Sequence, residues 1–415
     1  MPVLRPKSWP QSHEGSEAPA LGQHLLDDGY SYPVATLRLD AIEHNLRWMQ
    51  AWAKRKGAYL APHGKTTLSP ELWRMQLQAG AWGLTVAHVR QAFLAVDNGA
   101  QRCIIANQVF SSVDLSDLHA LLDQQPHVKV WFLVDSLQQL RLIEAWHAAH
   151  ASERCFDVLL ELGTAGFRTG CRTSEEAFHL ARAIHASPAV RLAGIEVYEG
   201  GLAKFDLDNE AASVSELLSR SLQVIHGIDA EDLWQDEQVL VTAGGSAIFD
   251  LVMPLLSGLS LKRSCVGVLR SGCYITHDHG HYADFLRLVE QREHLPDSLK
   301  PALEVWALVQ SVPEPGLAIL SAGRRDVSYD QRMPTTTQWA SHGGRVSRPA
   351  PMHWKIQTLS DQHAHMRFDP SLETPCVGDR IALGISHPCT TFDKWQRMVV
   401  IDQDMQVVGS IHTEF

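Results

Sequence analysis

The feature that most constrains the fold of this chain is a series of eight short apolar runs separated by amphipathic stretches. Each run has the length and composition of a buried strand, and the stretches between them carry apolar residues at helical spacing. One stretch opens with Thr173 and Glu176, the spacing of a capping box. Eight strands alternating with helices predict an α/β fold, and the number eight favours a closed, TIM-like (β/α)8 barrel. The runs are residues 59–64, 82–88, 102–107, 128–136, 156–163, 192–200, 238–245 and 264–272.

The hydrophobic pattern of the sequence changes near residue 275. Beyond it, short β patterns follow one another with few helical stretches, which predicts a C-terminal, mostly β domain. We therefore expect an N-terminal lead-in over 1–34, a barrel over 35–275 and a β domain over 276–415. The first part of the lead-in, residues 1–23, is Pro-rich and is expected to be loosely ordered. The strand-like segment 35–40 precedes the first barrel strand and is a candidate to pair with the C-terminal sheet. An open doubly wound sheet is the alternative, but no Gly-x-Gly-x-x-Gly follows the first run.

Composition narrows the class of protein. The chain has 36 basic and 47 acidic residues, a net charge of −11, which argues against a nucleic-acid partner. No window approaches the ~18 consecutive apolar residues of a membrane span, so no membrane partner is expected. The N-terminus lacks the apolar core of a secretory signal, and the seven cysteines have no framework spacing. A reduced, cytoplasmic location fits these features.

A lysine stands at the end of the first run, in the segment Pro62-His63-Gly64-Lys65-Thr66. Side chains at the C-terminal ends of barrel strands face the active site. A partly desolvated lysine there has a lowered pKa and can attack a carbonyl group. The alternative is an ordinary lysine in a surface loop.

Two later strand ends have the composition of a phosphate site. Gly244, Gly245 and Ser246 enter a helix-like segment, where backbone N–H groups can face an anion, although a Gly-Gly pair also makes plain tight turns. Phosphate sites in barrels lie after strands seven and eight. After the eighth run, Gly272 and Tyr274 would add a backbone donor and a phenol. A lysine and a monophosphate pocket in one barrel mouth predict pyridoxal 5′-phosphate as cofactor.

On these motifs the chain resembles the pyridoxal-phosphate barrel enzymes of the alanine racemase type, and within them the D-serine dehydratase and D-threonine aldolase branch. The matching segments span nearly the whole chain. The resemblance implies that Lys65 carries the cofactor, that Arg168 lies near the cofactor ring and that Tyr198 lies near its pyridine nitrogen. It also makes His63 a candidate to contact the substrate or to support the residues that do. Relatives often carry an arginine two residues before this histidine, where this chain has Ala61. The phosphate ligands that it implies are Gly244, Gly245, Ser246, Gly272 and Tyr274.

Near the C-terminus, His387 and Cys389 are separated by one residue. On an extended segment such side chains point to the same side and can hold one divalent metal, although the spacing also arises by chance. The resemblance implies a metal pair, because His-x-Cys is the D-serine dehydratase pattern and aldolases more often show His-x-Asp. Imidazole and thiolate favour zinc over magnesium. It also makes His363 a candidate contact to substrate or metal. The histidine-rich segment 277–282 is expected to be a solvated rim or a lid.

The function we expect is that of a metal-dependent ammonia-lyase, a dehydratase that converts D-serine or a related D-3-hydroxyamino acid to a 2-oxo acid and ammonia. Lys65 would remove the α-proton, and the metal would polarise the hydroxyl group. A retro-aldol enzyme releasing glycine and an aldehyde is the alternative, and a racemase would need a second base such as Tyr329. A non-enzymatic cofactor carrier is disfavoured by about 140 further residues and the metal pair. Relatives of this kind are commonly homodimers, so a homodimer is expected.

Overall fold

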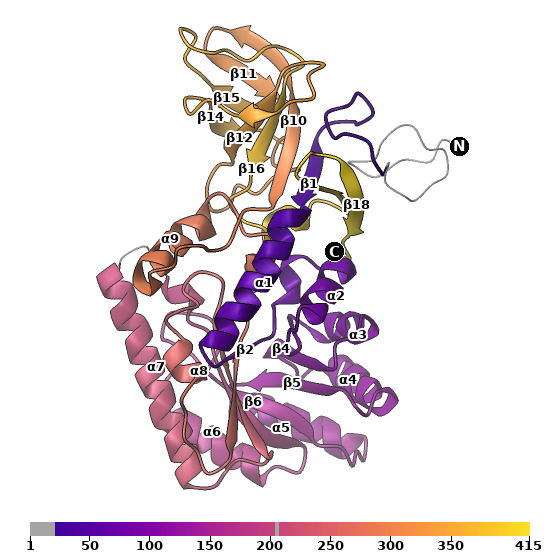
Figure 1. Cartoon of the computed structure of the whole chain (residues 1–415). Coiled ribbons are helices and arrows are strands. Elements are labelled where there is room, and N and C mark those ends of the chain that lie inside the picture. Colours follow the sequence, from indigo (N-terminus) through magenta and orange to yellow (C-terminus); the bar gives the residue numbers. More distant parts are fainter. Residues whose placement is uncertain (1–20, 204–206) are drawn as a thin grey trace. The chain divides into compact units, whose positions relative to one another are not determined.

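The computed structural model describes residues 21–203 and 207–415, and the chain divides into two compact units. The barrel unit comprises Met49–Lys65 and Trp73–Gly272. The β unit comprises the chain up to Trp48, Thr66–Leu72 and Cys273–Phe415. Most of the barrel unit is coloured purple to salmon in Figure 1, and most of the β unit is indigo, orange or yellow.

The barrel unit contains eight parallel strands in the order β2-β9-β8-β7-β6-β5-β4-β3. The two ends of this order are joined, because the Trp82 N–H donates to the Leu60 carbonyl (2.8 Å) and the Thr85 N–H to the Pro62 carbonyl (2.9 Å). The sheet closes on itself, and the predicted (β/α)8 barrel is confirmed. Its strands are β2 (Tyr59–Leu60), β3 (Leu84–Val86), β4 (Arg102–Gln108), β5 (Lys129–Val134), β6 (Phe156–Leu162), β7 (Val190–Val197), β8 (Gln238–Ala243) and β9 (Ser264–Leu269).

A cluster of apolar side chains from successive barrel strands forms a core of this unit, and polar side chains follow it toward the C-terminal ends of four strands. Because side chains alternate along a strand, residues two positions beyond an apolar layer project to the same face. These positions carry polar groups and mark the end of the barrel where active sites lie. The cluster contains Ala61, Ile104, Trp131, Leu133, Leu159, Ala193, Leu240 and Val268. The polar residues are His63, Glu161, Thr242 and Arg270.

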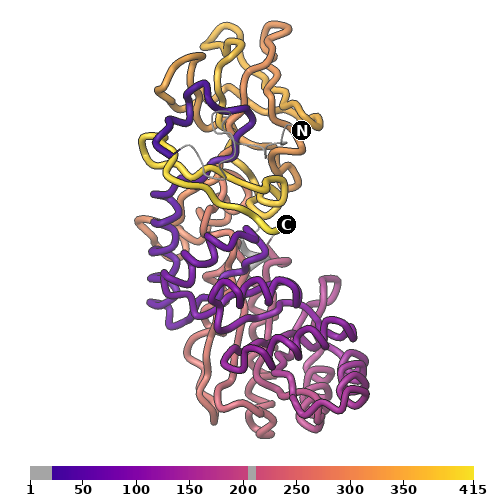
Figure 2. Tube along the Cα trace, turned by 90° about the vertical axis from the view of Figure 1, so that its right-hand side faces the viewer, coloured from indigo at the N-terminus to yellow at the C-terminus, as the bar shows by residue number. Residues whose placement is uncertain are grey.

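Helices lie on the outside of the barrel strands in both views (Figures 1 and 2). Helix α6 begins at the predicted capping box: the Glu176 N–H donates to Thr173 Oγ1 (3.1 Å), and the Thr173 N–H donates to the Glu176 carboxylate (3.2 Å). These bonds satisfy donors that the first helical turn leaves without an intrahelical acceptor. The helices that follow barrel strands are α3 (Val89–Asp97), α4 (Ser112–Gln124), α5 (Leu137–Ala149), α6 (Ser174–Ala186), α7 (Leu207–Ala230) and α8 (Met253–Leu256).

The β unit contains a ten-stranded sheet. Strand β1 (Val34–Arg38) pairs antiparallel with β10 and parallel with β17, so a strand that precedes the barrel in sequence lies within a sheet built by the last third of the chain. The other strands are β10 (Leu303–Glu314), β11 (Leu317–Leu320), β12 (Thr335–Ala340), β13 (Arg348–Pro349), β14 (Lys355–Leu359), β15 (Ala364–Arg367), β16 (Arg380–Gly384), β17 (Arg397–Ile401) and β18 (Val407–His412).

The lead-in expected over 1–34 belongs to the β unit, and its first twenty residues lie outside the described part of the chain. Leu25 and Leu26 are buried in one apolar cluster with Trp306 and Val399. The expectation of loose order concerned residues 1–23 and stays a prediction, while apolar contacts of Leu25 and Leu26 hold the chain that follows on the sheet.

The β unit also contains helices. Helix α9 (His281–Glu293) lies in the region expected to be mostly β, and the short helix α10 (Cys389–Phe392) follows β16. Helix α1 (Leu39–Arg55) runs from residues of the β unit into residues of the barrel unit, and α2 (Pro70–Gln78) does the same. Within 21–203 and 207–415, no helix combines the length and the apolar character needed to cross a bilayer.

Candidate active site

Lys65 lies in the 3₁₀ turn η1 (Gly64–Thr66), shortly after β2. The Trp73 indole N–H donates to the Gly64 carbonyl (3.2 Å), and a Cβ at position 64 would lie 2.7 Å from the Trp73 ring. The turn therefore requires glycine, and the indole holds it in place. The Lys65 side chain is exposed, and the partly desolvated amine expected from the sequence stays a prediction.

His63 precedes the lysine by two residues and has a buried Nδ1 with no hydrogen-bond partner among the described residues. Its backbone bridges to Thr85 of β3. Burial, together with the positive charges of Lys65 and Arg270, holds the pKa of His63 well below its usual range. The ring is therefore neutral at pH 7, and its unpaired nitrogen is available to a bound polar group.

Arg270 follows β9 and is buried in the polar layer of the barrel. Its guanidinium donates to the Glu196 carboxylate and, at 3.0 Å, to Thr242 Oγ1. Burial raises the pKa of Glu196 to about 8, although the Arg270 charge opposes this shift. One carboxylate oxygen of Glu196, Oε2, is buried without a hydrogen-bond partner in the described part of the chain. The pair thus fixes a guanidinium in the barrel and leaves one acceptor unsatisfied.

Of this polar layer, sequence reasoning named His63 and missed Glu161, Thr242 and Arg270. Glu161, Glu196 and Arg270 each interrupt or directly follow an apolar strand, and that interruption was the available signal. Charged residues are rarely buried unless they are paired, so a charged residue within a buried strand indicates a specific polar partner. Thr169 Oγ1 donates to the Glu161 carboxylate (2.6 Å), and burial raises the pKa of Glu161.

The backbone donors of the predicted phosphate turn are occupied by a carboxyl group of the chain itself, that of Glu199. The N–H groups of Gly244 and Gly245 donate to the Glu199 carboxylate at 3.0 and 2.8 Å. Gly244 has φ +96°, and a Cβ there would lie 2.2 Å from the Leu269 side chain, so this position requires glycine. The Gly272 N–H donates to Ser246 Oγ (3.3 Å). A phosphate can use the two glycine donors only if Glu199 leaves them.

Arg168 and Tyr198 contact each other. The Arg168 guanidinium lies 4.1 Å from the centre of the Tyr198 ring, a cation–π contact, and both side chains are exposed. They line a cavity of about 250 Å³ that also includes Glu161 and Thr169. The structure therefore brings together two residues that the resemblance placed at the cofactor ring, and it sets a buried carboxylate beside them. Their roles toward a cofactor stay predictions.

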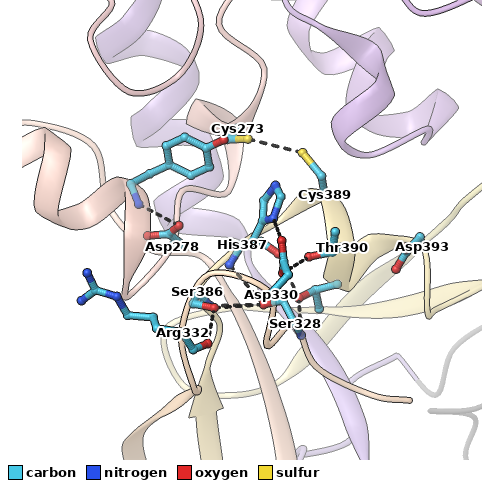
Figure 3. Close-up of polar contacts among 12 residues, drawn as sticks. Cys273, Asp278, Ser328, Asp330, Arg332, Ser386, His387, Cys389, Thr390 and Asp393 are labelled. Atoms are coloured by element: carbon cyan, nitrogen blue, oxygen red, sulfur yellow. Dashed lines mark hydrogen bonds and ion pairs between the residues drawn. The ribbon is translucent and has the colours of Figure 1, made fainter. Parts of the chain in front are cut away.

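In the β unit, His387 is held by a carboxylate (Figure 3). Its Nδ1 lies 2.6 Å from Asp330 Oδ2, and Thr390 Oγ1 donates to the other Asp330 oxygen at 2.7 Å. Burial opposes ionisation of Asp330, but the hydrogen bonds from Thr390 and His387 outweigh it and lower the Asp330 pKa. A carboxylate only accepts, so Nδ1 carries a proton, and Nε2 is the ring nitrogen left to bind a metal. That arrangement is typical of a metal-binding histidine.

Cys389 is the first residue of α10, and its neighbour Pro388 has helical backbone angles (φ −57°, ψ −47°). The expectation of an extended segment across His387 and Cys389 is therefore wrong, because the chain turns into a helix between them. The Cys389 sulfur lies 3.5 Å from Thr66 Oγ1 and 3.6 Å from the Cys273 sulfur. Sequence spacing offered no reason to pair Cys389 with Cys273.

In the histidine-rich segment 277–282 the first residues are buried, so the expectation of a solvated rim is wrong for them, and the alternative of a lid over the barrel stays a prediction. His277 and Asp278 are 2% and 0% exposed. The Asp278 carboxylate accepts from the N–H groups of Gly280, Tyr282 and Ala283, each at 3.0 Å, at the start of α9. Through these bonds, the buried Asp278 carboxylate caps the N–H groups at the start of α9 in the β unit.

The remaining predicted residues lie in different places of the β unit. Tyr274 is buried in the 3₁₀ turn η3 (Cys273–Ile275). His363 is exposed in the turn that joins β14 to β15, and its carbonyl accepts from the Ser360 N–H (2.8 Å). Tyr329 is 42% exposed, with the Arg324 guanidinium 5.5 Å from its ring centre. Their assigned roles stay predictions.

Two family models match the chain. Residues 37–249, about half of the chain, match the N-terminal domain of alanine racemase, and residues 302–401 match a putative serine dehydratase domain. The chain belongs to the alanine racemase-type, D-serine dehydratase-like family. This family is pyridoxal-phosphate-dependent, and its barrel followed by a mostly β domain is the fold described above.

Relatives in the family include lyases of two kinds. D-threonine aldolase of Arthrobacter sp is 28% identical over 372 residues, covering 89% of this chain and 88% of that protein. D-threo-3-hydroxyaspartate dehydratase of Delftia sp. (strain HT23) is 24% identical over 409 residues, covering 92% and 96%. The family therefore assigns this chain to enzymes of the lyase class.

Solved structures show the same fold. D-threonine aldolase from Filomicrobium marinum has a TM-score of 0.74 at 25% identity, covering 95% of this chain and 97% of that one. Two variants of D-threo-3-hydroxyaspartate dehydratase have TM-scores of 0.72 and 0.71 at 21% identity, covering 95% and 94% of this chain and 97% and 99% of theirs. One carries a His-to-Ala change and the other a Cys-to-Ala change, separated by one residue, and the second is described as a metal-free form.

Proposed function

We propose that this protein is a pyridoxal-phosphate- and metal-dependent dehydratase that converts D-serine or a related D-3-hydroxyamino acid to a 2-oxo acid and ammonia. The observation that carries the proposal is His387, held at Nδ1 by Asp330, with Cys389 two positions on. The dehydratase variants described above change a histidine and a cysteine with this same separation, and the cysteine variant is metal-free. A thiolate in this place favours the dehydratase over the aldolase.

The residues of the barrel unit fit pyridoxal phosphate. An exposed lysine stands at the end of the barrel where sites form, and the buried His63 Nδ1 and Glu196 Oε2 lack hydrogen-bond partners among the described residues. The diglycine turn already holds an anion, the carboxylate of Glu199. A phosphorylated aromatic aldehyde with a phenol oxygen and a ring nitrogen has groups for each of these sites.

The donor chemistry of the β unit fits a soft divalent metal. His387 presents Nε2, and Cys389 presents a thiol. Among the described residues, no group of three or more His, Cys, Asp or Glu side chains is already arranged around a metal position. The fit therefore rests on the nature of these ligands and on the orientation of the imidazole.

Bound pyridoxal phosphate would withdraw electrons from Cα of an attached amino acid, and a bound divalent metal would polarise the β-hydroxyl group. Lys65 Nζ is the base for the α-proton, and its exposed position in η1 leaves it free to reach a substrate. His63 stays neutral and supplies a hydrogen-bonding nitrogen without adding charge. Arg270, fixed by Glu196 and Thr242, supplies a permanent positive charge in the polar layer.

In the β unit, His387 and Cys389 would hold the metal. Asp330 keeps the proton on His387 Nδ1, and Thr390 fixes Asp330 in turn. This chain of hydrogen bonds orients the imidazole and raises its basicity toward a metal.

Product identity tests the proposal. The purified protein, loaded with pyridoxal phosphate and Zn²⁺, is incubated separately with D-serine, D-threonine and D-threo-3-hydroxyaspartate. We expect ammonia and a 2-oxo acid in equal amounts, and no glycine. Release of glycine with an aldehyde would overturn the dehydratase assignment, and interconversion of D and L forms without ammonia would identify a racemase.

The aldolase reaction is the second candidate. It is favoured by the D-threonine aldolases of Arthrobacter sp and Filomicrobium marinum, which match this chain at 28% and 25% identity. The same lysine and metal residues would serve, with the proton taken from the β-hydroxyl group instead of Cα.

Zinc as the metal, a homodimeric assembly and a cytoplasmic location belong to the same proposal. Zinc is supported by the imidazole and thiol ligands. The homodimer and the location rest on the resemblance, the scattered cysteines and the net charge of −11.

A further inference from the structure

Two cysteines far apart in the sequence meet in the β unit (Figure 3). Cys273 in η3 and Cys389 at the start of α10 are separated by 116 positions, and their sulfurs lie 3.6 Å apart. Cys273 is 3% exposed. Thr66 Oγ1 lies 3.5 Å from the Cys389 sulfur and 3.8 Å from the Cys273 sulfur, so the two sulfurs and one hydroxyl form a compact triangle.

The separation of the sulfurs suits one metal ion. Thiolates bind zinc at about 2.3 Å, and two of them on a tetrahedral ion lie roughly 3.8 Å apart. A disulfide would require about 2.05 Å, and these cysteines are not joined by one. The observed 3.6 Å is close to the first value and far from the second.

The ligand count also points to Cys273. Catalytic zinc sites use three protein ligands and keep a fourth position open for water or substrate, and two cysteines with one histidine are an established set. His387 and Cys389 supply only two. We infer that Cys273 is a second thiolate ligand of the metal, an inference that rests on the proposed metal role of His387 and Cys389. Each thiol releases its proton to solvent as the metal binds.

The third ligand of the proposed metal site, besides Cys273 and Cys389, is the His387 imidazole. Figure 3 shows the His387 ring pointing toward the side on which Cys389 and Cys273 lie. The three side chains do not form a closed group within the described ranges, so a metal held by all three would require the imidazole to move toward the sulfurs. In that case Asp330 would have to move with the imidazole or release its Nδ1.

The test counts sulfur atoms around the metal in the full-length enzyme. Wild-type protein is purified under reducing conditions, loaded with Zn²⁺ and examined by X-ray absorption, and a Co²⁺-loaded sample is examined for thiolate-to-cobalt charge transfer. We expect two sulfur ligands in the wild type. In Cys273→Ser we expect one sulfur ligand, half the charge-transfer intensity and a loss of Zn²⁺ affinity of at least about 100-fold. Cys376→Ser, which changes an exposed cysteine, is the matched control and keeps both sulfurs.

The outcomes separate this inference from the proposed function. A single sulfur ligand in the wild type would overturn the role of Cys273 and leave His387 and Cys389 as ligands. Failure of the wild type to bind Zn²⁺ or Co²⁺ would overturn both. An intact mass about 2 Da lower in the purified, non-reduced enzyme, with the peptides of Cys273 and Cys389 cross-linked, would assign the pair to a disulfide instead. The wild-type spectrum decides the question even if Cys273→Ser does not fold.

Discussion

Glu199 occupies two backbone N–H groups that the cofactor phosphate is predicted to use. Its carboxylate accepts from Gly244 and Gly245, and burial raises its pKa. A phosphate and a carboxylate carry like charges, so they compete for the same donors. The residue thus has opposite expected effects on an empty and on a loaded turn: it holds the loop when no phosphate is bound and must be displaced when one is.

Replacing Glu199 by Gln tests this competition. Hydrogen bonds to a charged acceptor are stronger than those to a neutral amide, so Glu199→Gln should bind pyridoxal phosphate about tenfold more tightly, or ~1.4 kcal/mol. Titration of the cofactor-free protein, followed by absorbance, measures the affinity. Glu231→Gln, which changes a surface carboxylate paired with Arg182, is the control. Weaker binding in Glu199→Gln would show that the carboxylate supports the turn rather than blocking it.

The largest loss of activity expected from a single substitution is at Lys65. Lys65→Ala removes both the attachment point and the base, so activity should fall by at least ~10³-fold, and the absorbance of covalently bound cofactor should disappear. Lys54→Ala, at an exposed position near the end of α1, should change neither. Full activity in the Lys65→Ala protein would end the mechanism proposed above.

At the level of elements, the start of α9 depends on one buried carboxylate. Asp278 accepts three backbone N–H bonds there, at a helix end where a negative charge is favoured. Burial nevertheless raises the pKa of Asp278 from 3.8 to about 6, against the lowering effect of these bonds. Removal from water therefore outweighs the cap, and the folded protein holds this proton more tightly than the unfolded chain does.

The sign of the pH effect follows from that shift. Because the folded pKa lies above the unfolded value, the contribution of Asp278 is full below pH 4 and is lost as the pH rises to about 6. The free energy of unfolding of the wild type, relative to Asp278→Asn, should therefore fall by up to ~3 kcal/mol across this window. Denaturant titrations of both proteins at pH 4, 5, 6 and 7 measure the difference. A difference that rises with pH would mean that the cap outweighs burial.

For the whole molecule, the predicted cofactor attachment and the predicted metal ligands belong to different units. Lys65 is in the barrel unit, and His387 and Cys389 are in the β unit. Three separate segments of the chain form the β unit, and two of them supply its strands, since β1 precedes the barrel and β10 to β18 follow it. Cofactor attachment at Lys65 and metal binding at His387 and Cys389 are therefore expected to respond separately to a treatment that acts on only one of them.

Metal removal tests this separation. After treatment with a chelator, activity toward D-3-hydroxyamino acids should fall at least ~100-fold, because the β-hydroxyl group loses its Lewis acid. The absorbance of the lysine-bound cofactor should remain, since Lys65 does not depend on the metal. Both readings are taken on the same sample, and added Zn²⁺ should restore the activity. Retained activity after complete removal of the metal would exclude the role assigned to His387 and Cys389.

Local patterns were sufficient for much of the fold. The apolar runs predicted all eight barrel strands, because a buried strand needs a short continuous apolar segment, and Thr173 with Glu176 predicted the start of α6. The β patterns beyond residue 275 predicted the second sheet, although α9 was missed. The position of Lys65 after a barrel strand followed from the same reasoning.

The sequence by itself determined which elements form and which residue types stand at their ends, because strand burial and helix capping depend on neighbours within a few positions. Only the tertiary structure decided which groups meet. It set Glu199 on Gly244 and Gly245, paired Arg270 with Glu196, buried Asp278 and brought Cys273 to Cys389. These contacts join residues up to 116 positions apart, where no local pattern constrains the distance, and they arise from how the strands and loops pack.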